Sequence, residues 1–182
     1  MVEARGLPVC APEEVWCQLG SMLTVDDLVV AADALLHMAD GRADEWRTAL
    51  RSALDEGRWA GSPALREALA FTRPRCWPPG ETRIRLLLLR AGLPEPELNG
   101  VIVGDDGSFL GTADLVWRDR KVLLEYEGAR QGSDEGRFRS DVERYERFRD
   151  AGWIVLRATA DDLRTAARRA ALARRVARYV LG

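Results

Sequence analysis

Residues 111–117 read GTADLVW and residues 121–128 read KVLLEYEG, with the polar segment RDR at 118–120 between them. Both apolar stretches are rich in Val and Leu and also contain Trp or Tyr, residue types that suit buried strands. The polar segment is short, so the pattern predicts an antiparallel hairpin of largely buried strands.

Acidic residues stand at one end of the expected hairpin. If the turn pairs Trp117 with Val122, the register places Asp114 opposite Glu125, and directly opposed residues share a face of the sheet. Glu127 follows Glu125 by two residues and therefore lies on the same face. The sequence thus predicts three carboxylates gathered at one end of an apolar hairpin.

Three neighbouring carboxylates in an apolar setting repel one another and are poorly solvated unless a cation lies among them. A hard divalent ion with oxygen ligands, Mg²⁺ or Mn²⁺, fits this requirement. The alternative is that the acids simply point into water, since charged residues are rarely fully buried unless paired. Val116, Leu123 and Leu124 flank the acids, and this apolar setting favours the cation site.

Further motifs follow one another in order along the chain. They are PGETR at 79–83, AGLP at 91–94, Asp114-Leu115, EYEG at 125–128, Arg144, GWIVLR at 152–157 and Asp161-Asp162. The ordered set resembles the PD-(D/E)XK nuclease superfamily. It is most similar to the small endonuclease domain related to very-short-patch repair endonucleases, found in actinobacterial endonuclease-domain and antitoxin-like proteins. The resemblance covers about residues 79–162.

The resemblance implies an α/β fold with a restriction-endonuclease-like core over residues 76–182. In this core the order of elements is α-β-β-β-α-β-α, and helices flank a mixed sheet. Residues 1–75 are expected to form an α-helical N-terminal extension, because helix-start signals recur there. One of these signals is Thr24 followed three residues later by Asp27, a capping pattern. The proline-rich segment at 71–79 is the expected joint between the two parts.

The resemblance also implies a function, the metal-dependent hydrolysis of phosphodiester bonds in DNA with Mg²⁺ or Mn²⁺ as cofactor. It assigns three groups of site residues. The catalytic residues are Glu81, Asp114, Glu125 and Glu127; the metal ligands are Asp114, Glu125 and the Tyr126 carbonyl; and the nucleic-acid-binding residues are Arg130, Gln131, Arg137 and Arg144. Glu81 stands in the first turn of an expected helix, where an acid is also favoured by the helix dipole alone.

Two positions depart from the family pattern. Glu127 stands where the motif has Lys, and Gln131 stands where related proteins usually carry His. The amide of Gln131 has no proton to exchange near neutral pH, so it cannot act as a general acid or base. These departures favour an alternative, a catalytically degenerate nuclease-fold protein. Such a protein binds DNA or a partner protein in a defence or toxin–antitoxin system.

Charge is distributed unevenly along the 182 residues. Residues 137–182 hold 12 Lys and Arg against 6 Asp and Glu, although the whole chain has a net charge of −2. A basic segment of this kind suits phosphate, so DNA is the expected partner, together with a second copy of the chain or a partner protein. No apolar run is long enough to span a bilayer and no signal peptide is evident, so a cytoplasmic location is expected. No small-molecule cofactor is expected.

Overall fold

The computed structural model describes residues 2–4, 6–39, 41–128 and 135–182. The chain divides into two compact units, Met1–Thr82 and Arg83–Gly182. The division expected from the sequence, at residues 75 and 76, falls slightly earlier. Each unit is described by itself.

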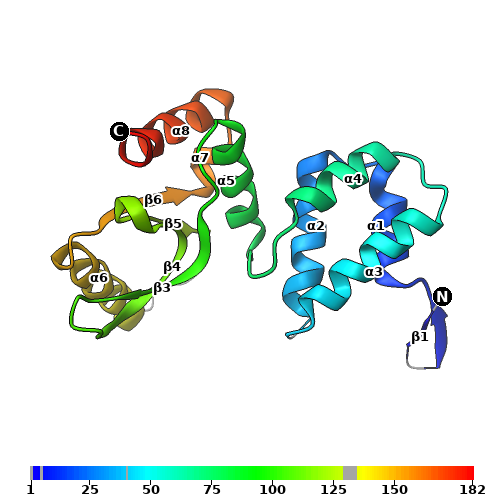
Figure 1. Cartoon of the computed structure of the whole chain (residues 1–182), viewed down its shortest axis with the longest axis horizontal. Coiled ribbons are helices and arrows are strands. Elements are labelled where there is room, and N and C mark those ends of the chain that lie inside the picture. The colour runs from blue at the N-terminus through cyan, green and yellow to red at the C-terminus, as the bar shows by residue number, and fades with distance from the viewer. Residues whose placement is uncertain (1, 5, 40, 129–134) are drawn as a thin grey trace. The chain divides into compact units, whose positions relative to one another are not determined.

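The first unit consists mainly of helices, preceded by a small hairpin (Figure 1). Its elements are β1 (Val2–Ala4), β2 (Leu7–Val9), α1 (Pro12–Gln18), the 3₁₀ turn η1 (Leu19–Ser21), α2 (Val25–Met38), α3 (Ala43–Glu56) and α4 (Ser62–Phe71). The β1–β2 hairpin was not expected, because the sequence pattern predicted helices throughout. Gly6 has a φ of +79°, a conformation that glycine adopts readily in tight turns.

The helices of the first unit pack through apolar side chains that are almost completely buried, among them Trp16, Leu28 and Leu50. The expected cap is confirmed, because the Thr24 side chain accepts a hydrogen bond from the Asp27 N–H. Asp33 is also fully buried. Its carboxylate accepts hydrogen bonds from the Arg73 N–H (2.7 Å) and the Thr82 hydroxyl (2.9 Å). This carboxylate therefore ties α2 to the segment that follows α4.

The second unit contains a four-stranded mixed sheet flanked by helices, which confirms the expected α/β class in this general form. Its elements are α5 (Pro79–Arg90, which begins in the first unit), β3 (Glu97–Val103), β4 (Phe109–Trp117), the 3₁₀ turn η2 (Arg118–Arg120), β5 (Val122–Glu127), α6 (Glu135–Asp150), β6 (Ile154–Thr159), α7 (Ala160–Leu163) and α8 (Ala166–Val180). The strand order is β3-β4-β5-β6. β4 pairs in antiparallel fashion with β3 and with β5, whereas β6 runs parallel to β5.

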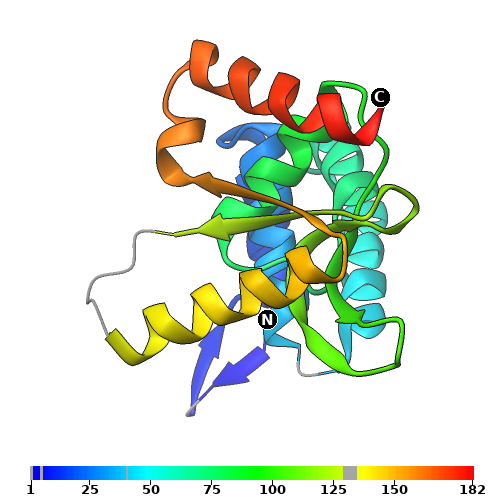
Figure 2. The ribbon, with the colours of Figure 1, turned by 90° about the vertical axis from the view of Figure 1, so that its left-hand side faces the viewer.

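Helices cover both faces of this sheet (Figure 2). On one face α5 and α8 pack through Ile84, Leu88 and Val176 against Leu115 and Leu124. On the other face, Tyr145 and Phe148 of α6 lie in a second apolar cluster with residues of β4 and β5. None of the helices in the described part of the chain is both long and apolar enough to cross a membrane.

Gly111 of β4 lies against α6 and leaves no room for a larger residue. A Cβ atom there would lie 2.9 Å from Cζ of Phe148 and 3.1 Å from Cδ of Arg144, and φ is +152°. We expect Gly111→Ala to lower the free energy of unfolding by about 1–3 kcal/mol, through the combined clash and backbone strain. Urea denaturation measures this loss.

Gly107→Ala is the matched control. Gly107 also has a positive φ, +81°, but no atom lies within 4 Å of the position that a Cβ would take there. Only the backbone cost, about 1 kcal/mol, is therefore expected for this variant. Equal losses for the two variants would show that the packing of α6 on Gly111 contributes nothing.

Candidate functional site

The candidate site begins where β4 and β5 stop pairing. The predicted register is confirmed, since Trp117 pairs with Val122 and the ladder continues to Leu115 and Leu124. At the next position the Asp114 carboxylate accepts a hydrogen bond from the backbone N–H of Tyr126 (2.7 Å). A side-chain oxygen thus satisfies a strand N–H that would otherwise pair with backbone, and the two strands end their ladder there.

Glu125 lies beside Asp114 and is only 5% exposed. Burial, and next the charge of Asp114, raise the pKa of the Glu125 carboxyl group from 4.5 to about 7. The Arg144 guanidinium opposes this shift, and the charge of Asp141 adds to it. Asp114 is therefore held close enough to Glu125 for its charge to disfavour the ionised form of Glu125.

Arg144 projects from α6 into this group of acids. Its guanidinium donates to the Thr112 carbonyl (2.9 Å) and lies 3.4 Å from a carboxylate oxygen of Glu125 and 3.3 Å from one of Asp141. The guanidinium carbon also stands 5.1 Å from the centre of the Tyr145 ring. The expected DNA-binding residue Arg144 is thus placed directly on the expected metal ligand Glu125.

Glu127 has a different partner. Its carboxylate forms an ion pair with Arg157, which the parallel pairing of β5 and β6 brings alongside. The Arg157 guanidinium stands 5.6 Å from the Tyr145 ring, so this ring contacts both arginines. Burial, and next the charge of Glu125, raise the pKa of Tyr145 above its ordinary value. The phenol therefore stays neutral near physiological pH.

The other expected site residues are less closely connected. Glu81 is buried in the first turn of α5 and belongs to the first unit. Tyr126 contributes its backbone N–H, while its side chain packs against the α5–α8 core. Arg130 and Gln131 lie outside the described residues, as does the side chain of Arg137. In the described parts of the chain, no three His, Cys, Asp or Glu side chains form a group suited to one metal ion.

Two side chains of the site were not expected from the sequence, Tyr145 and Arg157. The sequence predicted Tyr145 on the apolar face of a helix, and this pattern does not indicate contact with arginines. Arg157 closes the GWIVLR motif at 152–157. Its position beside Glu127 depends on the register of a parallel strand pair, which no local pattern specifies.

The donor chemistry nevertheless fits a hard divalent cation. Asp114 and Glu125 offer carboxylate oxygens, and their mutual repulsion is the condition that a bound cation relieves. Mg²⁺ in proteins is usually held by one or two carboxylates, with water and substrate phosphate completing its ligands. Two acids are therefore sufficient, and Glu127 is not required as a third ligand.

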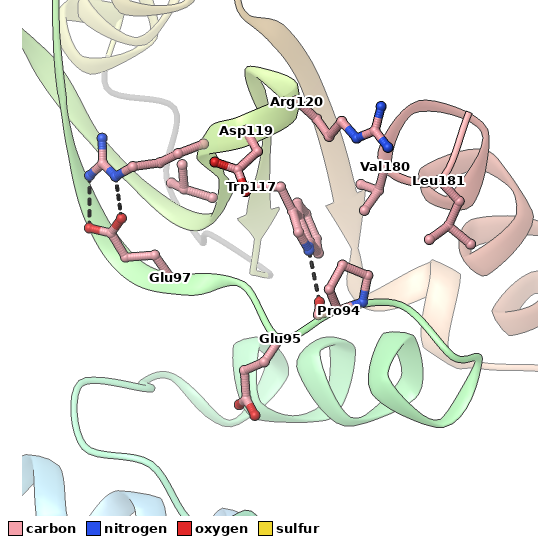
Figure 3. Close-up of a pocket in the computed structure, with 10 residues that line it drawn as sticks. Pro94, Glu95, Glu97, Trp117, Asp119, Arg120, Val180 and Leu181 are labelled. Carbon is pink, nitrogen blue, oxygen red and sulfur yellow. Dashed lines mark hydrogen bonds and ion pairs between the residues drawn. The ribbon is translucent and has the colours of Figure 1, made fainter.

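A pocket of about 410 Å³ lies in the same unit, near the turn that joins β4 to β5 (Figure 3). Its lining includes Trp117, whose indole N–H donates to the Pro94 carbonyl (2.8 Å), and Arg118, which is paired with Glu97. None of the expected site residues lines it. It is distinct from the acidic group, which lies at the other end of the β4–β5 pair.

Two curated proteins, both described as uncharacterized, are similar in sequence to this chain. The chain is 31% identical over 135 residues to the uncharacterized protein MT2308 of Mycobacterium tuberculosis strain CDC 1551 / Oshkosh, and equally to the uncharacterized protein Rv2248 of strain ATCC 25618 / H37Rv. Each match covers 74% of this chain and 49% of the relative. The chain thus spans about half the length of the curated relatives it matches. No family model matches the chain. No solved structure matches it significantly.

The raised pKa of Glu125 predicts how stability depends on pH. Between its ordinary value of 4.5 and its folded value of about 7, the folded state binds more protons than the unfolded state. The free energy of unfolding therefore falls as pH rises through this window, by at most about 3 kcal/mol. Glu125→Gln removes the titrating group, so the variant is expected to lose this dependence and to exceed the wild type in stability above about pH 7.

Urea denaturation at about pH 5 and about pH 8, with metal ions chelated, tests this expectation. Glu143→Gln is the control, since Glu143 is exposed on α6. If the wild type and Glu125→Gln lose the same stability between the two pH values, Glu125 is not the group responsible.

Proposed function

We propose that this chain is a metal-dependent, endonuclease-like protein that hydrolyses phosphodiester bonds in DNA. The observation that carries the proposal is the adjacent pair Asp114 and Glu125, held at the point where β4 and β5 separate. Repelling acids placed together inside a protein are costly unless a cation joins them. They are also the residues that the motif resemblance assigns to the metal.

The arrangement of secondary structure supports the same proposal. The second unit runs as helix, three strands, helix, strand and terminal helices. Its last strand, β6, is parallel to β5, the third of the consecutive strands. This order and the mixed sheet are consistent with a restriction-endonuclease-like core, in which the acids stand at one end of the central strands.

In the proposed mechanism Asp114, Glu125 and the Tyr126 carbonyl would hold Mg²⁺ or Mn²⁺. When bound, the ion would supply positive charge that polarises the phosphodiester. Glu127 would orient the attacking water or accept its proton, and the ion pair with Arg157 fixes the position of the Glu127 carboxylate. Arg130, Gln131 and Arg137 contact the sugar–phosphate backbone without reading base sequence.

A second candidate function is the binding of DNA or a partner protein without hydrolysis, in a defence or toxin–antitoxin system. The observation that favours it is that arginines already neutralise Glu125 and Glu127. A site neutralised in this way has less need of a metal ion. In this case Asp114→Asn would leave the function of the protein intact.

Nicking of supercoiled plasmid separates the two candidates. The wild type is expected to nick in Mg²⁺ or Mn²⁺. Removing both acids, Asp114→Ala with Glu125→Ala, is expected to lower the rate at least about 100-fold, because the charge that stabilises the transition state is lost with the metal. The rate of conversion to open-circular plasmid measures the effect.

A matched control removes the same charges elsewhere, Asp105→Ala with Glu143→Ala. Both of these acids are exposed, and the double variant should nick at the wild-type rate. If the wild type does not nick with either metal but still retards DNA in a gel, the binding-only candidate is correct and the hydrolysis proposal fails.

A further inference from the structure

Arg144 occupies the position in the site where a cation is required. It contacts Glu125 through both terminal nitrogens, at 3.5 Å and 3.4 Å, and Asp141 at 3.3 Å. Its side chain is 23% exposed, so it is held within the site rather than extended into solvent. This inference rests on the proposed function, because it concerns how the same acids take up a metal ion.

A guanidinium and a divalent metal ion compete for the same carboxylate. Both are positive and both need the oxygens of Glu125, so each weakens the binding of the other. Arg144 cannot relieve this conflict by losing its proton, because arginine stays charged in proteins. When a metal ion binds Glu125, Arg144 keeps its contact with Asp141, and the N–H groups that faced Glu125 become available to another anion.

The contact distances show which bond of Arg144 is easily exchanged. The bond to the Thr112 carbonyl, 2.9 Å, has the length of an ordinary hydrogen bond. The contacts with Glu125 exceed this range. Thr112 and the rings of Tyr145 and Phe148 therefore anchor the side chain. The Glu125 contacts are the weaker part of its environment.

A phosphodiester is the anion that would replace Glu125. Guanidinium groups bind phosphate oxygens with two parallel hydrogen bonds, more strongly than they bind neutral acceptors. We infer that Arg144 exchanges Glu125 for a backbone phosphate of DNA, and that this exchange makes metal binding and DNA binding depend on each other. DNA removes the competing cation from Glu125, and the metal ion frees Arg144 for DNA.

The first measurement is Mn²⁺ binding to the full chain without DNA, by titration calorimetry. Arg144→Met keeps the apolar stem against Phe148 but removes the competing charge, so it is expected to bind Mn²⁺ about tenfold more tightly than the wild type. Arg144→Lys retains a positive charge and should stay within about threefold of the wild type. Arg147→Met, on the exposed side of the same helix, should also leave the affinity unchanged.

The second measurement is the affinity for a fluorescent DNA duplex, by anisotropy, with and without Mn²⁺. Coupling between two ligands is reciprocal, so Mn²⁺ should strengthen DNA binding by the wild type about tenfold. In Arg144→Met this gain should become clearly smaller, because only the direct attraction between the metal ion and the phosphate then remains. In Arg147→Met the gain should persist.

Two results overturn the inference while leaving the proposed function standing. One is that Arg144→Met binds Mn²⁺ no more tightly than the wild type. The other is an equal gain of DNA affinity from Mn²⁺ in both proteins. If neither protein binds Mn²⁺, with DNA or without it, the metal-dependent function itself fails, and the inference fails with it.

Discussion

The hydrogen bond from the Tyr126 N–H to the Asp114 carboxylate is the constraint on which the site depends. Up to Leu115 and Leu124, β4 and β5 form an ordinary antiparallel ladder that is buried on both faces. In a continuing ladder a backbone carbonyl would accept the hydrogen bond from the Tyr126 N–H. Here a carboxylate oxygen of Asp114 accepts it instead, so the N–H keeps a partner although the two strands no longer pair. The half-buried carboxylate of Asp114 is thereby fixed next to Glu125.

Charge balance explains the rest of the site. Glu125 and Glu127 are two residues apart on β5, and each is paired with an arginine from a different element, Arg144 of α6 and Arg157 of β6. Both guanidinium groups lie against the ring of Tyr145, where the ring face attracts positive charge. The ring thus contacts both guanidinium groups, and with the two ion pairs these contacts join α6 and β6 to β5.

The hairpin could be predicted from the sequence because its information is local. A short polar turn between two apolar runs specifies the register, and the register alone sets Asp114 beside Glu125. The helix cap at Thr24 was predictable for the same reason. The pairing of Glu127 with Arg157 was not, since 30 residues separate them and only the parallel alignment of β5 and β6 joins them. The hairpin of β1 and β2 was also missed, because strands of three residues carry almost no periodic signal.

The same contacts bear on Glu127, which stands where the motif that the sequence resembles has Lys. A lysine at position 127 would add positive charge directly on β5, beside Glu125. In this chain Glu127 is neutralised by Arg157, and the positive charge nearest Glu125 comes from Arg144 on a helix. Gly111 makes that position accessible, because any larger residue would meet the stem of Arg144. In this chain the positive charge next to the acids therefore lies on a helix, whereas the motif that the sequence resembles has it on the strand. Under the proposed function, the residue to compare with the missing Lys is Arg144 rather than Glu127.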